Sequence, residues 1–131
     1  MTHSILRTLA AGIVLSAAGA VWAHHNMSAL FDFDQRFTRT GVLTRADWIN
    51  PHIYLAVDVK NDEGKMERWS FEGPAPNFFR TRKINKTDFE QAIGKTVTVE
   101  ASRARDGSLK GLMRVFTLPD GREISLCPQN C

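Results

Sequence analysis

The chain has few of the residues that cross-link small proteins. Only two of its 131 residues are cysteines, Cys127 and Cys131, and both stand in the closing C-P-Q-N-C. Nearby cysteines usually pair in an oxidising compartment, so we expect a disulfide here. Because this bond would close a very short loop, it would constrain little of the unfolded chain. A metal or redox role, or free and intermolecular thiols, are the alternatives for this pair.

Long apolar runs are also missing. The longest stretch of apolar and small residues starts at Leu9 and spans about 13 residues, whereas roughly 20 are needed to cross a bilayer. Arg7 precedes this stretch and V-W-A ends it, which predicts a secretory signal peptide over residues 1–23, cleaved after Ala23. We therefore expect a mature chain of residues 24–131, periplasmic or secreted, with no membrane anchor.

Neither sign of charge is in strong excess. The chain has 17 basic and 14 acidic residues, and removal of Arg7 with the signal peptide leaves 16 and 14. So mild a surplus does not indicate a nucleic-acid partner, and export would separate the protein from nucleic acid. The mature length suits a single domain. We expect a monomer with an unidentified protein partner.

Familiar catalytic motifs are absent. The sequence contains no G-x-S-x-G, no Gly-rich phosphate loop and no H-E-x-x-H, so no catalytic residues are predicted. Asp32 and Asp34 flank Phe33 and would share one strand face, but no partner group accompanies them. We interpret them as the solvated face of an edge strand. The sequence therefore favours a binding protein over an enzyme.

The mature chain does contain a series of short β-prone segments. The clearest is 53–59, where Ile, Leu, Val and Val alternate with Tyr, Ala and Asp. Strands are predicted over residues 41–49, 53–59, 66–72, 95–104, 111–118 and 123–126, and helices over 76–82 and 87–93. This order predicts a mainly β protein, a small five-stranded OB-fold-like barrel with a short helical insertion between strands 3 and 4. A small β-sandwich is the alternative, and in either fold the aromatic residues are expected in the core.

Histidine is scarce, and its placement is the main functional signal. The mature chain has His24, His25 and His52. Because the alternating apolar residues from Ile53 onward form the core face, His52 and Tyr54 are expected on the opposite face of their strand. His52 would then be available to a metal or a partner.

Cleavage after Ala23 would give His24 a free α-amine beside its own imidazole. These two nitrogens, with a third from His52 or from His25, form a set that suits Cu(II). Zinc is possible with all three histidines. Met27 could add a thioether to Cu(I), and Trp48, Asn50 and Tyr54 are possible accessory residues. The alternatives are that the two N-terminal histidines form a solvated tail and that His52 only hydrogen-bonds in its turn.

The His24 arrangement is similar to the histidine brace of copper monooxygenases and of certain periplasmic copper carriers. A wider resemblance rests on A-H-H-N-M, D-W-I-N-P-H, W-S-F-E-G-P-A-P-N and D-G-R together. The chain resembles a family of small exported bacterial proteins classed as a domain of unknown function. The matching positions are His24, His25, Trp48, Asn50, Pro51, His52, Trp69 and Asn77. This resemblance implies kinship and export but no chemistry, and C-P-Q-N-C is outside its pattern.

Three functions follow as hypotheses. The first is an exported protein that binds copper through His24, His25 and His52 and carries or buffers it. The second is a metal-free structural or protein-interaction module that uses the face around Trp48 and Tyr54. The third is a copper-dependent oxidoreductase.

Overall fold

The computed structural model describes residues 27–126. The chain divides into two compact units, residues 1–30 and 31–131. In the first unit residues 27–30 are described, and they are helical. Among the described residues, no helix is both long and apolar enough to span a membrane.

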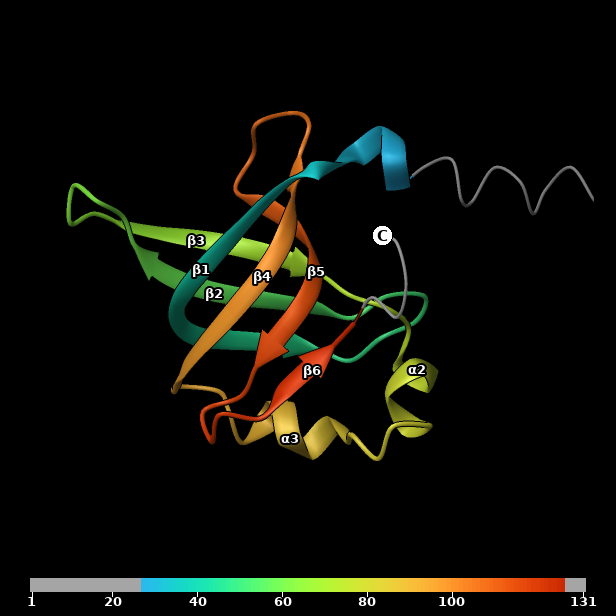
Figure 1. The fold of residues 1–131 in the computed structure, drawn as a ribbon. Helices are drawn as coiled ribbons and strands as arrows, with labels where there is room; N and C mark the ends of the chain where they lie inside the picture. The colour runs from blue at the N-terminus through green and yellow to red at the C-terminus, as the bar shows by residue number, and fades with distance from the viewer. Residues whose placement is uncertain (1–26, 127–131) are drawn as a thin grey trace, which may run out of the picture. The chain divides into compact units, whose positions relative to one another are not determined.

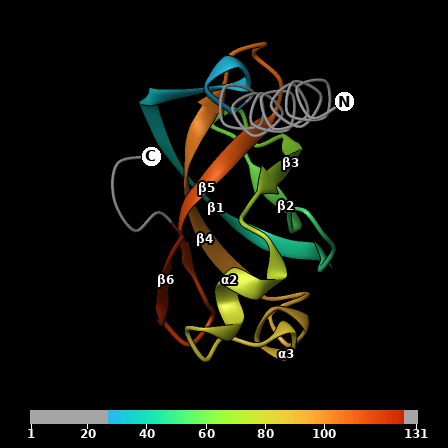
Figure 2. The same cartoon turned by 90° about the vertical axis from the view of Figure 1, so that its right-hand side faces the viewer.

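The described part of the second unit is mainly β, as predicted (Figure 1). Its elements are β1 (Phe31–Asp47), β2 (Tyr54–Lys60), β3 (Met66–Glu72), α2 (Pro76–Arg80), α3 (Lys86–Glu90), β4 (Thr96–Ala104), β5 (Lys110–Thr117) and β6 (Glu123–Ser125). The strands form one sheet in the order β3-β2-β1-β4-β5-β6, and neighbours in this order are antiparallel. β3 also pairs with β5 in parallel. The two short helices lie at one end of the sheet, between β3 and β4 in sequence (Figure 2).

The alternation in β2 divides its side chains between two faces, as predicted. Its apolar positions and the residue before it are at most 5% exposed; they are Ile53, Leu55, Val57 and Val59. His52 and Tyr54 are only partly buried. Because the alternation has a period of two, His52 and Tyr54 lie on the face away from the core.

The predicted limits of the first strand are wrong. β1 covers Phe31–Asp47, whereas the sequence predicted residues 41–49. The first half of β1, F-D-F-D-Q-R-F-T-R-T, carries many charged and polar side chains, and most of its positions from Asp34 to Thr40 are exposed. Its strand character comes from pairing with β4, which a local apolar pattern does not reveal.

Asp32 and Asp34, interpreted from the sequence as the solvated face of an edge strand, lie in the half of β1 that pairs with β4, and the pairing of β1 with β2 begins only at Val42. Asp34 is exposed and Asp32 is partly buried. The β1–β4 register passes directly from Asp32 to Arg36, so the residues between them form a bulge. Within this bulge Asp32 accepts hydrogen bonds from Gln35 and from Arg105, at 3.2 and 3.3 Å.

The core is rich in aromatic residues, as expected. The largest fully buried side chains include Trp69, Phe71, Phe79, Phe89 and Phe116. Helices α2 and α3 contribute Phe79 and Phe89 to this core, and the ring of Phe89 stacks on that of Phe116 in β5 at 5.1 Å. The helices therefore close the core at their end of the sheet.

Both helices are shorter than predicted, at five residues each instead of seven. α3 begins after Asn85, whose side chain and backbone form a capping box with Asp88. Gly94, predicted to end the second helix, has a φ of +82° and donates its N–H to Leu43 O at 2.7 Å. A glycine there permits the left-handed conformation that brings the chain back to β1.

Candidate metal-binding site around His52

His52 lies where the chain enters β2, directly opposite the end of β3. Gly73 N donates to Ile53 O at 2.9 Å, and Ile53 N donates to Pro74 O at 3.2 Å. These bonds extend the β2–β3 pairing by one step beyond Tyr54. The backbone next to His52 is therefore fixed, while its side chain is 35% exposed.

The His52 imidazole is held by a carboxylate on the neighbouring strand. His52 Nδ1 lies 2.5 Å from Glu72 Oε1, and the Glu72 side chain is 16% exposed. Because an ionised carboxylate only accepts hydrogen bonds, the contact with Glu72 favours, for a neutral ring, the tautomer with the proton on Nδ1. The other nitrogen, Nε2, then keeps its lone pair, and its direction is set by the bond to Glu72.

Tyr54 shares the same carboxylate. It is the register partner of Glu72 across β2 and β3. Burial raises the pKa of the Tyr54 hydroxyl, and the charge of Glu72 and a hydrogen bond to it add to the increase. The hydroxyl donates a hydrogen bond to Glu72, so one carboxylate contacts both His52 and Tyr54.

The other predicted accessory residues near His52 have different surroundings. The Trp48 ring packs against Phe79 and Phe89, with centroids 4.9 and 5.2 Å away, so its indole is part of the core boundary. Asn50 is exposed and is joined to Pro51 by a cis peptide bond. The structure thus brings His52 and Tyr54 together through Glu72 and directs Trp48 into the core.

The remaining predicted ligands are not part of this described site. His24 and His25 lie outside the described residues, and so do Cys127 and Cys131. Met27 belongs to the helical residues 27–30 of the first unit. Within residues 27–126, no three His, Cys, Asp or Glu side chains are grouped closely enough to hold a metal ion. His52 therefore offers one nitrogen ligand, and a metal would need further ligands from elsewhere.

Glu72 is the residue of this candidate site that the sequence interpretation missed. The signal for it was present: a turn at N-D-E-G joins two strands of equal length. Counting outward from that turn pairs Lys60 with Met66 and Tyr54 with Glu72, which is the observed register. Paired residues point to the same face of a sheet, so the hairpin alone places a carboxylate beside Tyr54.

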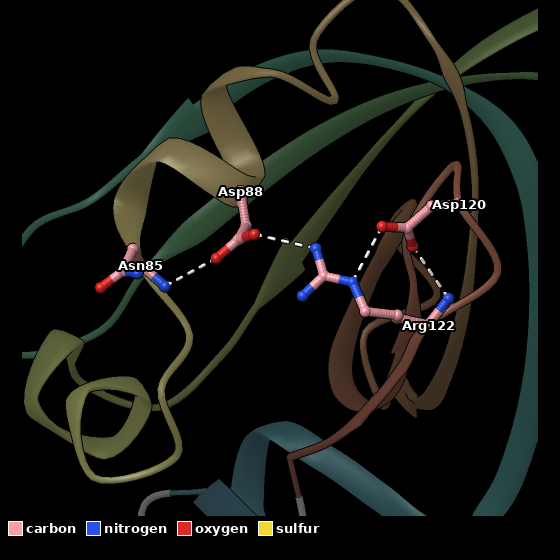
Figure 3. A network of polar contacts seen from close by, with 4 residues as sticks. All are labelled: Asn85, Asp88, Asp120 and Arg122. Atoms are coloured by element: carbon pink, nitrogen blue, oxygen red, sulfur yellow. Dashed lines mark hydrogen bonds and ion pairs between the residues drawn. The ribbon is translucent and has the colours of Figure 1, made fainter.

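A second polar network joins α3 to the β5–β6 turn (Figure 3). Arg122 Nη2 donates to Asp88 Oδ1 at 2.9 Å, and Arg122 Nε donates to Asp120 Oδ2 at 2.8 Å. The Asn85 N–H donates to Asp88 Oδ2 at 2.8 Å. The hydrogen bond from Arg122 is the main cause that lowers the pKa of Asp88. Because each charge here already has an opposite charge beside it, the network is a structural link.

Residues 11–114 match a family of unknown function, DUF6152. This match includes the described residues from Met27 to Arg114 and ends before β6 and the two cysteines. Comparison with curated proteins and with solved structures gives no match. The expected relationship to a family of unknown function is confirmed, and the family supplies no activity.

Proposed function

We propose that this chain, which belongs to the family of unknown function DUF6152, is an exported metal-binding protein that carries or buffers copper. His52 supplies one nitrogen ligand through Nε2. The mature N-terminus, His24, supplies its α-amine and its imidazole. The protein acts in the periplasm or outside the cell and passes the ion to a protein partner.

The observation that carries this proposal is the bond between His52 and Glu72. Metal-binding histidines usually donate their second ring N–H to a carboxylate or a carbonyl, which fixes the tautomer and makes the ligating nitrogen more basic. His52 has this arrangement, with Nδ1 2.5 Å from Glu72 and a side chain that is 35% exposed. An imidazole that served only packing would not need to be this exposed.

The proposed ligand set suits copper. Three nitrogen donors favour Cu(II) by geometry and by the order of metal affinities. His25 is an alternative third ligand, and Met27 can add a thioether if the ion is Cu(I). Zinc would use all three histidines, with water at an open position.

The fold we propose for the second unit is an OB-like barrel. The strand pairings run in a closed circuit, β1–β2–β3–β5–β4–β1, and α2 and α3 lie between β3 and β4. Both features are typical of an OB-fold. In such a barrel the face of β2 and β3 that carries Tyr54 and Glu72 is the outer face, which is accessible to an ion and a partner.

A calorimetric titration with Cu(II) tests this function. The mature protein beginning at His24 is compared with the same protein acetylated at its N-terminus. We expect tight one-to-one binding by the first and a large loss of affinity in the second, because acetylation removes the α-amine as a ligand and leaves every side chain in place. Equal binding by both proteins, or none, would contradict the proposal.

One observation favours a metal-free interaction module as the second candidate. Ile49, three residues before His52, is 54% exposed, and an apolar side chain beside a polar site is common in protein interfaces. In that case substitution Ile49→Ser would weaken capture of the partner without changing copper affinity. Under the copper proposal the same substitution leaves both the ligands and Glu72 intact.

A further inference from the structure

Arg114 in β5 is an unusually buried charge. It is 7% exposed, and the neighbouring Ser102 in β4 is fully buried. Arg114 Nη1 donates to Ser102 Oγ at 3.1 Å. Removing a guanidinium from water costs free energy unless an opposite charge compensates. The surroundings of Arg114 should therefore contain an anion.

No acidic side chain of the described residues forms an ion pair with Arg114. The charges that act on Arg114 are those of Arg36 and Glu100. Burial lowers the pKa of Arg114, and the charge of Arg36 lowers it further, while Glu100 opposes both effects. The positive charge of Arg114 is thus reinforced by a second arginine and only partly balanced.

A β-bulge produces this arrangement. In the β4–β5 register Ala101 pairs with Met113 and Glu100 pairs with Val115, so Arg114 is an extra residue on β5. A bulge changes the direction of the side chain that it carries. Here it places the guanidinium over Ser102. On the other side of β4, Ser102 is the register partner of Arg36 in β1.

The guanidinium also keeps some contact with solvent. In the part of the chain that the structure describes, every fully buried side-chain nitrogen or oxygen has a hydrogen-bond partner. The hydrogen bond of the Arg114 guanidinium is the one from Nη1. Its nitrogens without a bond therefore keep contact with solvent.

We propose that Arg36, Ser102 and Arg114 form a binding site for a small oxyanion, a carboxylate or a phosphate group. The planar fork of an arginine matches two oxygens of either group, and hydrogen bonds between opposite charges are stronger than neutral ones. Ser102 keeps the Arg114 guanidinium in place. Arg36 adds the second positive charge, and Glu100 moderates the affinity.

The site lies on the same face of the sheet as His52. The register pairs Tyr54 with Glu72, Glu72 with Leu112, Leu112 with Ser102, and Ser102 with Arg36. Paired residues share a face, so these positions form one row across β2, β3, β5, β4 and β1. Neighbouring strands are about 4.8 Å apart, which puts Ser102 roughly 10 Å from Glu72.

The test is anion binding measured by NMR on the mature protein. Phosphate and acetate are titrated separately up to about 10 mM at constant ionic strength, where general salt effects on stability are small. We expect saturable shifts at the amides of residues 102 and 114 with at least one of the two anions. The anion that produces these shifts shows whether the site binds a phosphate group or a carboxylate.

Variants separate the site from general attraction to a basic surface. Arg36→Gln should raise the dissociation constant about tenfold, because it removes one hydrogen bond between charged groups. Glu100→Gln should lower it. Arg80→Gln, which removes an exposed arginine on α2, is the matched control and should leave it unchanged. No saturable shift with either anion, or the same effect from Arg36→Gln and Arg80→Gln, would overturn the proposal.

Discussion

Glu72 determines the properties of two neighbouring residues. It forms a close ion-pair contact with His52 and accepts a hydrogen bond from Tyr54, and it is mostly buried, so water competes weakly for its oxygens. Replacing it changes the tautomer preference of one residue and the acidity of the other. Two predictions follow at the scale of these single residues.

Glu72→Gln should weaken Cu(II) binding about 10- to 100-fold, because an amide accepts the Nδ1 proton less strongly than a carboxylate and orients the ring less firmly. Calorimetry on the mature protein measures this change. Glu123→Gln, at an exposed position of β6, is the control for the loss of one negative charge. Equal affinities of the two variants would show that Glu72 does not support the ligand.

Tyr54 should ionise above the ordinary tyrosine pKa of about 10, because burial, the Glu72 charge and the bond to Glu72 all favour the neutral phenol. Tyr54 is the only tyrosine of the chain, so the phenolate absorbance reports it alone. Glu72→Gln should bring the Tyr54 pKa down towards the ordinary value. Because the neutral Tyr54 phenol is favoured in the folded protein, it contributes to the free energy of unfolding. This contribution is complete below the ordinary tyrosine pKa and is lost as pH rises through the raised pKa of the folded protein. The same Tyr54 pKa in the original protein and in Glu72→Gln would contradict the contact between Tyr54 and Glu72.

At the scale of elements, the link between α3 and the β5–β6 turn should contribute to stability. Asp88→Asn removes the charge that pairs with Arg122 and weakens the capping box at Asn85. We expect the free energy of unfolding in urea to fall by about 1 kcal/mol at neutral pH. Asp120→Asn should have a smaller effect, since Asp120 is 54% exposed.

The effect of Asp88→Asn should also depend on pH. Arg122 and the Asn85 N–H lower the pKa of Asp88. The carboxylate therefore stabilises the fold above the ordinary aspartate pKa of about 3.9, and this contribution is lost as pH falls through the lowered value. The difference in the free energy of unfolding between the original protein and Asp88→Asn should therefore become smaller in strong acid. A difference that stays constant would indicate a loss of packing instead.

The elements differ in how far local sequence predicts them. β2 and β3 are predicted closely because apolar alternation and a turn define them, and β3 matches residues 66–72. The first half of β1 is missed because its strand structure depends on β4, about 60 residues away. The bulge at Arg114 has no local signal, because it arises from the register between two strands.

The candidate site was predictable only in part. His52 and Tyr54 follow from the alternation of β2, and Glu72 follows from the hairpin register once the turn is located. Trp48 was expected near the site, but its ring packs on two helix residues that are distant in sequence. The Asp88–Arg122 contact spans 34 residues, and no short pattern specifies such a pair.

At the scale of the whole molecule, the copper proposal joins two distant parts of the chain. His52 belongs to the folded β unit, and His24 becomes the first residue after the predicted cleavage. If both bind one ion, copper fixes the N-terminus against the β2–β3 face. Because a ligand that binds only the native protein stabilises it, Cu(II) should then also raise the unfolding temperature.

The most direct test is the EPR spectrum of the one-to-one Cu(II) complex of the mature protein, compared with that of His52→Ala. We predict splitting from three nitrogen donors in the original protein: the His24 amine, the His24 imidazole and His52 Nε2. The splitting should reduce to two nitrogen donors in His52→Ala, in which His25 is unchanged. An identical spectrum in the two proteins would show that His52 is not a ligand and would contradict the central claim.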